Sequence, residues 1–180
     1  MADTRVVDTN VLIVASAAHQ DSPFEAHATP LQEAEHLQTV LKWVEAFHKD
    51  VDRHMVLDVE GHISNEYRNK LSEQNYGLLM MQHKISRGQV AWVYFDVDQN
   101  GHAKLSDALT KAVTDREDRK MVAAVLEAKV DGHTSKLVNA CDTDWLDCEK
   151  ALKSAGVEAE HLLEEQWLRP RWRAKKQKKT

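Results

Sequence analysis

The chain has few cysteines and no long apolar run. Among its 180 residues only Cys141 and Cys148 are cysteines, and they form neither a disulfide framework nor a zinc-ligand pattern. The longest apolar runs, such as VLIVA at residues 11–15, are far shorter than the roughly 20 residues of a membrane span. The first residues, MADTR, lack the basic-then-apolar order of a secretory signal. These absences predict a cytoplasmic protein with reduced cysteines and no membrane contact.

Acidic residues are absent from the last twelve positions, RPRWRAKKQKKT. This segment holds seven of the 24 Lys and Arg residues, whereas residues 1–168 hold all 29 Asp and Glu residues. We therefore expect a basic, disordered tail at residues 169–180 on an acidic body. A solubilising end is the simplest interpretation. The alternative is contact with nucleic acid, with Trp172 as a stacking residue and phosphate contacts from four basic residues: Arg171, Arg173, Lys175 and Lys176.

Strands and helices are predicted to alternate along the rest of the chain. Hydrophobic residues make up 42% of the sequence, which suits one globular domain over residues 1–168. Apolar spacing predicts strands at residues 5–14, 54–59, 90–97, 136–142 and 157–163. The 3.6-residue period predicts helices at residues 30–49, 62–71, 115–129 and 144–154. This alternation indicates an α/β sandwich built on a mainly parallel sheet.

Acidic side chains recur where the predicted strands end. Asp8 interrupts the first apolar strand, and Asp142 and Asp144 directly follow a later one. Asp118 lies in the first turn of a helix on its apolar side, and Glu66 lies one turn into another helix. The carboxyl ends of parallel strands share one edge of a sheet, so these acids should meet there. Clustered carboxylates repel one another unless a divalent cation neutralises them, which favours Mg²⁺ or Mn²⁺.

Four segments resemble, in order, the motifs of PIN-domain nucleases: VVDTNVLI, ISNEYRNKL, DREDRKMVAAVLEA and VNACDTDWL. The resemblance implies a PIN-like three-layer α/β/α sandwich and assigns residue roles. It implies that Asn10 orients the first acid. The implied catalytic acids, all metal ligands, are Asp8, Glu66, Asp118 and Asp142, and the implied further metal ligand is Asp144.

The activity implied by the resemblance is a divalent-metal-dependent endonuclease. Its substrate would be single-stranded nucleic acid, with RNA the first expectation and single-stranded DNA the second. Basic residues around the acidic site would attract the phosphates: Arg68, Lys70, Arg119 and Lys120. Small PIN proteins are often toxins held by an antitoxin, while others process RNA or act in defence, so an antitoxin, another regulatory protein or a homodimer partner is expected.

Residues 96–107, DVDQNGHAKLSD, nearly match an EF-hand calcium loop. Asp96, Asp98 and Asn100 occupy its first three ligand positions, and Gly101 follows them. However, a predicted strand precedes the loop where an EF-hand has a helix, and no partner loop follows. A tight polar turn is the simpler interpretation.

Two further alternatives apply to the acids. The DTD at residues 142–144 resembles the Asp-x-Asp of haloacid-dehalogenase phosphatases, but it lies late in the chain and before Trp145, so we reject that assignment. A catalytically silent PIN-like module that binds RNA or protein would be expected to lack acids, and here all are present. Asp58 ends its strand near the same edge. It either supports the metal ligands from beside the site or is an acid at a strand end with no role in the site.

Overall fold

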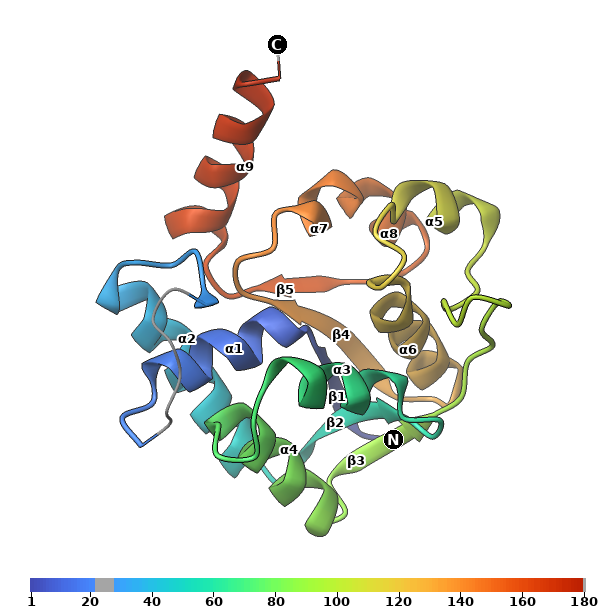
Figure 1. Ribbon diagram of the computed structural model, residues 1–180. Helices are drawn as coiled ribbons and strands as arrows, with labels where there is room; N and C mark the ends of the chain where they lie inside the picture. Colours follow the sequence, from blue (N-terminus) through green and yellow to red (C-terminus); the bar gives the residue numbers. More distant parts are fainter. Residues whose placement is uncertain (22–27, 180) are drawn as a thin grey trace.

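The computed structural model describes residues 1–21 and 28–179. Within them, five parallel strands form a single sheet in the order β3-β2-β1-β4-β5 (Figure 1). The strands are β1 (Asp3–Val7), β2 (Arg53–Asp58), β3 (Val90–Val93), β4 (Thr134–Asn139) and β5 (Ala159–His161). The predicted α/β sandwich on a parallel sheet is therefore confirmed.

Helices cover both faces of this sheet and complete the three layers. Helices α1–α4 lie on one face, and α5, α6 and α8 lie on the other (Figure 1). Their bounds are α1 (Thr9–Ala18), α2 (Ala34–Lys49), α3 (His62–Lys70), α4 (Tyr76–Ser86), α5 (Asp107–Ala112), α6 (Arg119–Val130), α7 (Asp144–Asp147), α8 (Glu149–Ser154), the π-helical turn η2 (Glu164–Leu168) and α9 (Arg169–Gln177). No helix in the described parts of the chain combines the length and apolar character that crossing a bilayer requires.

The first predicted strand is shorter than expected. Residues 5–14 do not form one strand, because β1 ends at Val7 and helix α1 begins at Thr9. Asp8 makes the break: its backbone is extended, and its side chain accepts a hydrogen bond from the backbone N–H of Asn10. A continuous apolar run does not distinguish a buried helix from a buried strand, so the strand predicted for VLIVA is wrong.

Helix α4, which the sequence did not predict, packs closely against α1. At Gly77 an added Cβ would lie 2.8 Å from Leu12 Cβ. The backbone N–H of Gly77 also donates to Ser16 Oγ at 3.0 Å. Because Gly77 has no side chain, α4 can pack closely against α1, the helix that begins directly after Asp8.

The basic C-terminal segment is not disordered as predicted. Residues 169–177 form helix α9, which projects from the body with no buried residue of its own (Figure 1). Two contacts hold it beside α7: Trp172 Nε1 donates to Asp147 Oδ1 at 2.8 Å, and Lys176 Nζ lies 2.5 Å from the same oxygen. The composition of the segment did not predict this helix, because the contacts that stabilise it come from Asp147 of α7. Residue 180 lies outside the described residues.

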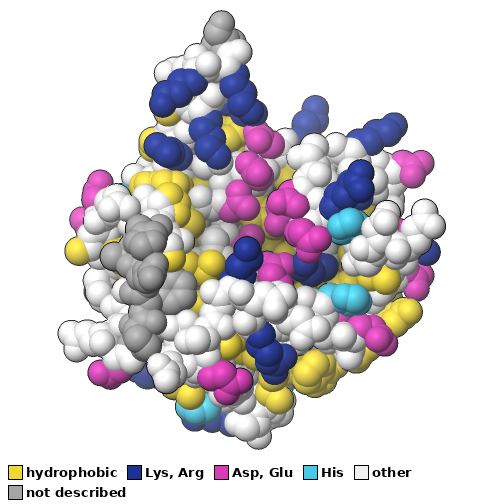
Figure 2. Space-filling model, viewed as in Figure 1, with side chains coloured by type: hydrophobic (Ala, Val, Ile, Leu, Met, Phe, Trp, Pro, Cys, Tyr) yellow, Lys and Arg dark blue, Asp and Glu magenta, His cyan; other side chains and the backbone are white. Residues whose placement is uncertain are grey.

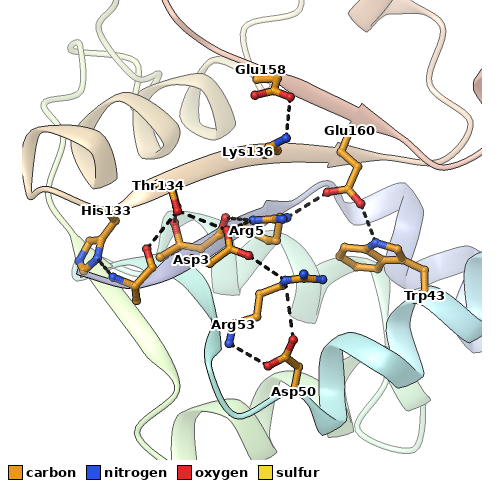
Figure 3. A network of polar contacts seen from close by, with 12 residues as sticks. Asp3, Arg5, Trp43, Asp50, Arg53, His133, Thr134, Lys136, Glu158 and Glu160 are labelled. Carbon is orange, nitrogen blue, oxygen red and sulfur yellow. Dashed lines mark hydrogen bonds and ion pairs between the residues drawn. The ribbon is translucent and has the colours of Figure 1, made fainter.

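At the amino-terminal edge of the sheet, charged side chains pair with one another. Arg5 lies between Asp3 and Glu160, with its Nε 3.0 Å from Glu160 Oε2, and Arg53 Nε lies 3.0 Å from Asp3 Oδ2 (Figure 3). Trp43 Nε1 donates to Glu160 Oε1 at 2.8 Å. This network links β5, β1 and β2, so Asp3 and Glu160 are each paired with an arginine.

Candidate metal centre

The candidate site lies where the strand order of the sheet reverses. Strands β1 and β4 are neighbours, yet the chain leaves β1 toward β2 on one side and leaves β4 toward β5 on the other (Figure 1). Ligands of open α/β sheets bind at the carboxyl ends of the strands at such a switch point. Asp8 follows β1, and Asp142 follows β4. The topology therefore delivers both acids to one crevice.

Asp118 completes a cluster of three carboxylates. One oxygen from each of Asp8, Asp118 and Asp142 lies within 4.8 Å of the other two. Asp118 is the N-cap residue of α6, but its side chain makes no capping hydrogen bond, so the carboxylate is available to the cluster. Asp and Glu side chains gather on this face below α9 (Figure 2). Oxygen ligands of one Mg²⁺ lie about 3–4 Å apart, so small side-chain rotations would let the three acids hold a single ion.

The electrostatics of the cluster favour a cation. Burial raises the pKa of Asp8 to about 7, and the charges of Asp142 and Glu66 add to this rise. Burial and the neighbouring charges of Asp8 and Asp142 raise the pKa of Asp118 to about 8, and burial also raises the pKa of Asp142. No ion pair joins these three acids to any described residue, unlike the acids of Figure 3. A divalent ion would supply the missing counter-charge.

Asp8 is held in place by two hydrogen bonds. Its Oδ1 accepts from the backbone N–H of Asn10 at 3.0 Å, and its Oδ2 accepts from Trp145 Nε1 at 2.6 Å. Trp145 is only 1% exposed, so its indole is fixed by packing. Each carboxylate oxygen keeps a lone pair for an ion. Sequence reasoning missed Trp145 as part of the site, although its position directly after DTD was the available signal.

Asn10 contacts Asp8 through its backbone N–H, while its side chain bonds the loop after β4. The side-chain Oδ1 accepts from the backbone N–H of Ala140 at 2.9 Å, and Nδ2 donates to Asn139 Oδ1 at 3.0 Å. Asn139 Oδ1 also accepts from the backbone N–H of Asp142 at 3.0 Å. Asn10 therefore fixes the loop that carries Asp142.

Glu66 and Asp144, the other two predicted ligands, lie beside the cluster rather than in it. Glu66 Oε1 accepts from the hydroxyl of Thr9, and Glu66 Oε2 lies 2.7 Å from Lys120 Nζ. Asp144 is exposed at the start of α7. Its backbone N–H donates to Asp142 Oδ1 at 2.9 Å. The structure thus gathers three of the five predicted acids.

A groove of about 620 Å³ opens beside Glu66 and Asp118. Three of its lining residues are basic: Lys70, Arg116 and Lys120. Two of the four predicted rim residues, Lys70 and Lys120, therefore line it. Arg119 instead donates to the backbone carbonyls of Thr110 and Val113, at 3.0 and 3.2 Å, and Arg68 is exposed outside it.

A second hollow, of about 310 Å³, lies between α7 and α9. Its walls combine the acids of α7 with basic residues of the C-terminal segment and one aromatic ring: Asp144, Asp147, Trp172, Lys175, Lys176, Lys178 and Lys179. Lys175 Nζ reaches back to Thr143 Oγ1 at 2.5 Å, next to Asp142. The acid cluster is therefore bordered by basic residues at the groove and at α9.

Asp58 has a structural task. One of its carboxylate oxygens accepts from the backbone N–H of His62 and the other from that of Ile63, both at 2.8 Å. These are two of the first unpaired N–H groups of α3, so Asp58 fixes the start of the helix that carries Glu66.

The loop at residues 96–107 contains a tight turn. Asp98 Oδ1 accepts from the backbone N–H groups of Asn100 and His102 at 2.8 and 3.0 Å. Val97 and Ala103 form an isolated antiparallel bridge across the turn. The carboxylate of Asp98, one of the residues that resemble calcium ligands, therefore bonds the backbone of the turn that follows it.

Comparison of the chain with protein-family models, with curated proteins and with solved structures gave no significant match. The resemblance to PIN-domain nucleases therefore stays a prediction from the sequence motifs.

Proposed function

We propose that this protein is a metal-dependent endonuclease that hydrolyses phosphodiester bonds in single-stranded RNA. The observation that carries the proposal is the convergence of Asp8, Asp118 and Asp142, with oxygens within 4.8 Å of one another at the carboxyl edge of a parallel sheet. The donors are all carboxylate oxygens, the ligands that Mg²⁺ and Mn²⁺ prefer.

Each residue of the centre has a task in this proposal. Asp8, Asp118 and Asp142 hold the ion, and Trp145 and the backbone of Asn10 keep Asp8 in its orientation. When bound, the ion activates a water for attack and offsets negative charge on the scissile phosphate. No histidine or serine nucleophile is needed.

The surroundings of the cluster suit a flexible polyanion. Lys70 and Arg116 line the groove on one side, and Lys175 and Lys176 lie on the α9 side. A phosphate backbone that crosses the acid cluster would meet basic residues before and after it. Trp172 borders the second hollow, where an unpaired base could stack on its ring. These features support a single strand as the substrate.

Cleavage explains the cluster better than binding alone. A module that only binds RNA gains nothing from three crowded carboxylates, since they repel phosphates and raise one another's pKa.

The cysteines Cys141 and Cys148 are both free and buried, which fits the reducing cytoplasm. A regulatory protein partner stays a prediction of the sequence resemblance.

The proposal is tested with end-labelled oligonucleotides of matched sequence. Purified protein is incubated with single-stranded RNA, single-stranded DNA and duplex RNA, each with Mn²⁺, Mg²⁺ or chelator, and an Asp8→Asn preparation detects contaminating nuclease. We expect internal cuts in single-stranded RNA that need Mn²⁺ or Mg²⁺ and vanish in Asp8→Asn. No cleavage by the wild type, or equal cleavage with chelator, would refute the proposal.

A further inference from the structure

One lysine side chain lies inside the acidic site. Lys120, on α6, is only 8% exposed. Its Nζ lies 2.7 Å from Glu66 Oε2 and 2.8 Å from Glu117 Oε2, so one ammonium joins an acid of α3 to an acid of the turn before α6. A buried ammonium is costly unless it is paired, so this placement is strongly determined by its two acidic partners.

Glu66 is engaged on both of its oxygens. The Thr9 hydroxyl donates to Oε1, and Lys120 binds Oε2. Glu66 nevertheless lies next to the cluster, because it lines the same groove as Asp118 and its donor Thr9 directly follows Asp8. Of the two predicted ligands outside the cluster, Glu66 is the one that lines the groove together with Asp118, where its carboxylate could bind a second divalent ion. Its coordinating position is already occupied by a fixed positive charge.

We infer that Lys120 is a built-in cation that takes the place of a second divalent ion, so that the centre binds a single ion at Asp8, Asp118 and Asp142. This inference rests on the proposed metal centre. A second divalent ion on Glu66 would lie within a few ångström of the ammonium and would be repelled by it. Lys120 also lines the groove. Its positive charge would therefore attract the substrate phosphate from the side on which a second ion would bind.

The inference separates the roles of the predicted acids. Three acids bind the ion directly. Glu66 instead holds Lys120, together with Glu117, and is a positioning residue for that charge.

The test counts tightly bound Mn²⁺ by electron paramagnetic resonance and calorimetric titration. The variants are Lys120→Met, which removes the charge, Lys120→Arg, which keeps it, and Lys153→Met. Lys153 is exposed and pairs with Glu149 on α8, so it controls for loss of an ion-paired lysine elsewhere. We expect one ion in the wild type, in Lys120→Arg and in Lys153→Met, and two in Lys120→Met. Adding Glu66→Gln to Lys120→Met should return the count to one.

The outcomes distinguish this inference from the proposed function. Two ions in the wild type, or one ion in folded Lys120→Met, would overturn the role of Lys120 while the metal centre stands. No tight ion in the wild type would instead refute the metal centre itself. If Lys120→Met fails to fold, the wild-type count and the Lys120→Arg count still decide whether a second ion enters beside a fixed charge.

Discussion

The indole Nε1 of Trp145 lies 2.6 Å from Oδ2 of Asp8, and the indole is almost fully buried. These residues are 137 positions apart in sequence and come from opposite sides of the switch point between β1 and β4. The bond joins the first acid of the cluster to the short helix α7 that follows Asp142. Asp8 is therefore held by the same segment that supplies its neighbour.

Trp145→Phe should weaken both stability and metal binding. The change leaves Asp8 Oδ2 without its donor, which costs about 1–3 kcal/mol of unfolding free energy, and it frees the carboxylate to rotate. Urea unfolding and Mn²⁺ titration measure the two effects. The matched control is Trp43→Phe, which removes an indole bond to Glu160 at the opposite edge. It should lose stability but keep Mn²⁺ affinity, and equal affinity loss in both variants would contradict the site-specific role.

The metal-free protein should lose stability as pH rises. The pKa of Asp8, about 7, and of Asp118, about 8, exceed the ordinary value of 3.8, so the folded state binds protons more tightly than the unfolded state between these values. The stabilisation from these two acids is complete below about pH 4 and is lost as pH rises through 7 to 8. Saturating Mn²⁺ should flatten this decline, because the ion replaces the protons.

This pH effect is measured as the difference between wild type and Asp118→Asn in urea unfolding from pH 5 to pH 8 with chelator. Taking the difference removes the contribution of groups that make stability rise with pH, such as His48, whose pKa is lowered by burial. Wild type should lose more stability than the variant over this range. A difference that is constant across pH would show that Asp118 is not part of a repelling cluster.

Lys175 and Lys176 of α9 should contribute to RNA affinity. Replacing both with Ser should weaken binding and reduce the salt dependence of the affinity, by about 0.7 in the log–log slope for each phosphate that the protein no longer neutralises. Filter binding at several salt concentrations measures the slope, with metal withheld to prevent cleavage. The control replaces Lys42 and Lys49, two exposed lysines of α2, which should leave the slope unchanged. An unchanged slope in the α9 variant would show that these two lysines do not contact RNA phosphates.

Gly77→Ala should destabilise the fold despite the better helix propensity of Ala. Propensity alone would favour Ala by about 1 kcal/mol, but the new Cβ would lie 2.8 Å from Leu12 Cβ and 3.1 Å from the Leu12 carbonyl. The expected result is a lower melting temperature than that of the wild type, measured by thermal unfolding. A more stable Gly77→Ala protein would show that α1 and α4 are not tightly packed.

The sequence predicted the layers of the fold because local patterns determine them. Alternating strand and helix periods indicated the parallel sandwich, and a parallel sheet brings residues after β1 and β4 to one edge. The convergence of Asp8 and Asp142 followed from that topology alone. Asp118 was predicted from its place on the apolar side of a helix expected at residues 115–129, whereas α6 begins at Arg119 and Asp118 is its N-cap.

Features that depend on tertiary packing were missed. Helix α1 uses an apolar run that also suits a strand, and only burial between the sheet and α2 decides it. Pairing of Glu66 with Lys120 depends on the distance between α3 and α6, which no local pattern contains. Helix α9 is held by Asp147 of α7, so its order was not visible in its own composition.

The most direct measurement compares Asp118→Asn with Asp131→Asn in Mn²⁺-dependent cleavage of single-stranded RNA. The two residues lie at opposite ends of the same helix, since Asp118 is the N-cap and Asp131 the C-cap of α6, and Asp131 is exposed. Both changes remove one carboxylate charge, but only the first belongs to the acid cluster. We predict that Asp118→Asn folds, binds Mn²⁺ at least tenfold more weakly and does not cleave, while Asp131→Asn matches the wild type. An Asp118→Asn protein that binds Mn²⁺ and cleaves RNA like the wild type would contradict the metal centre.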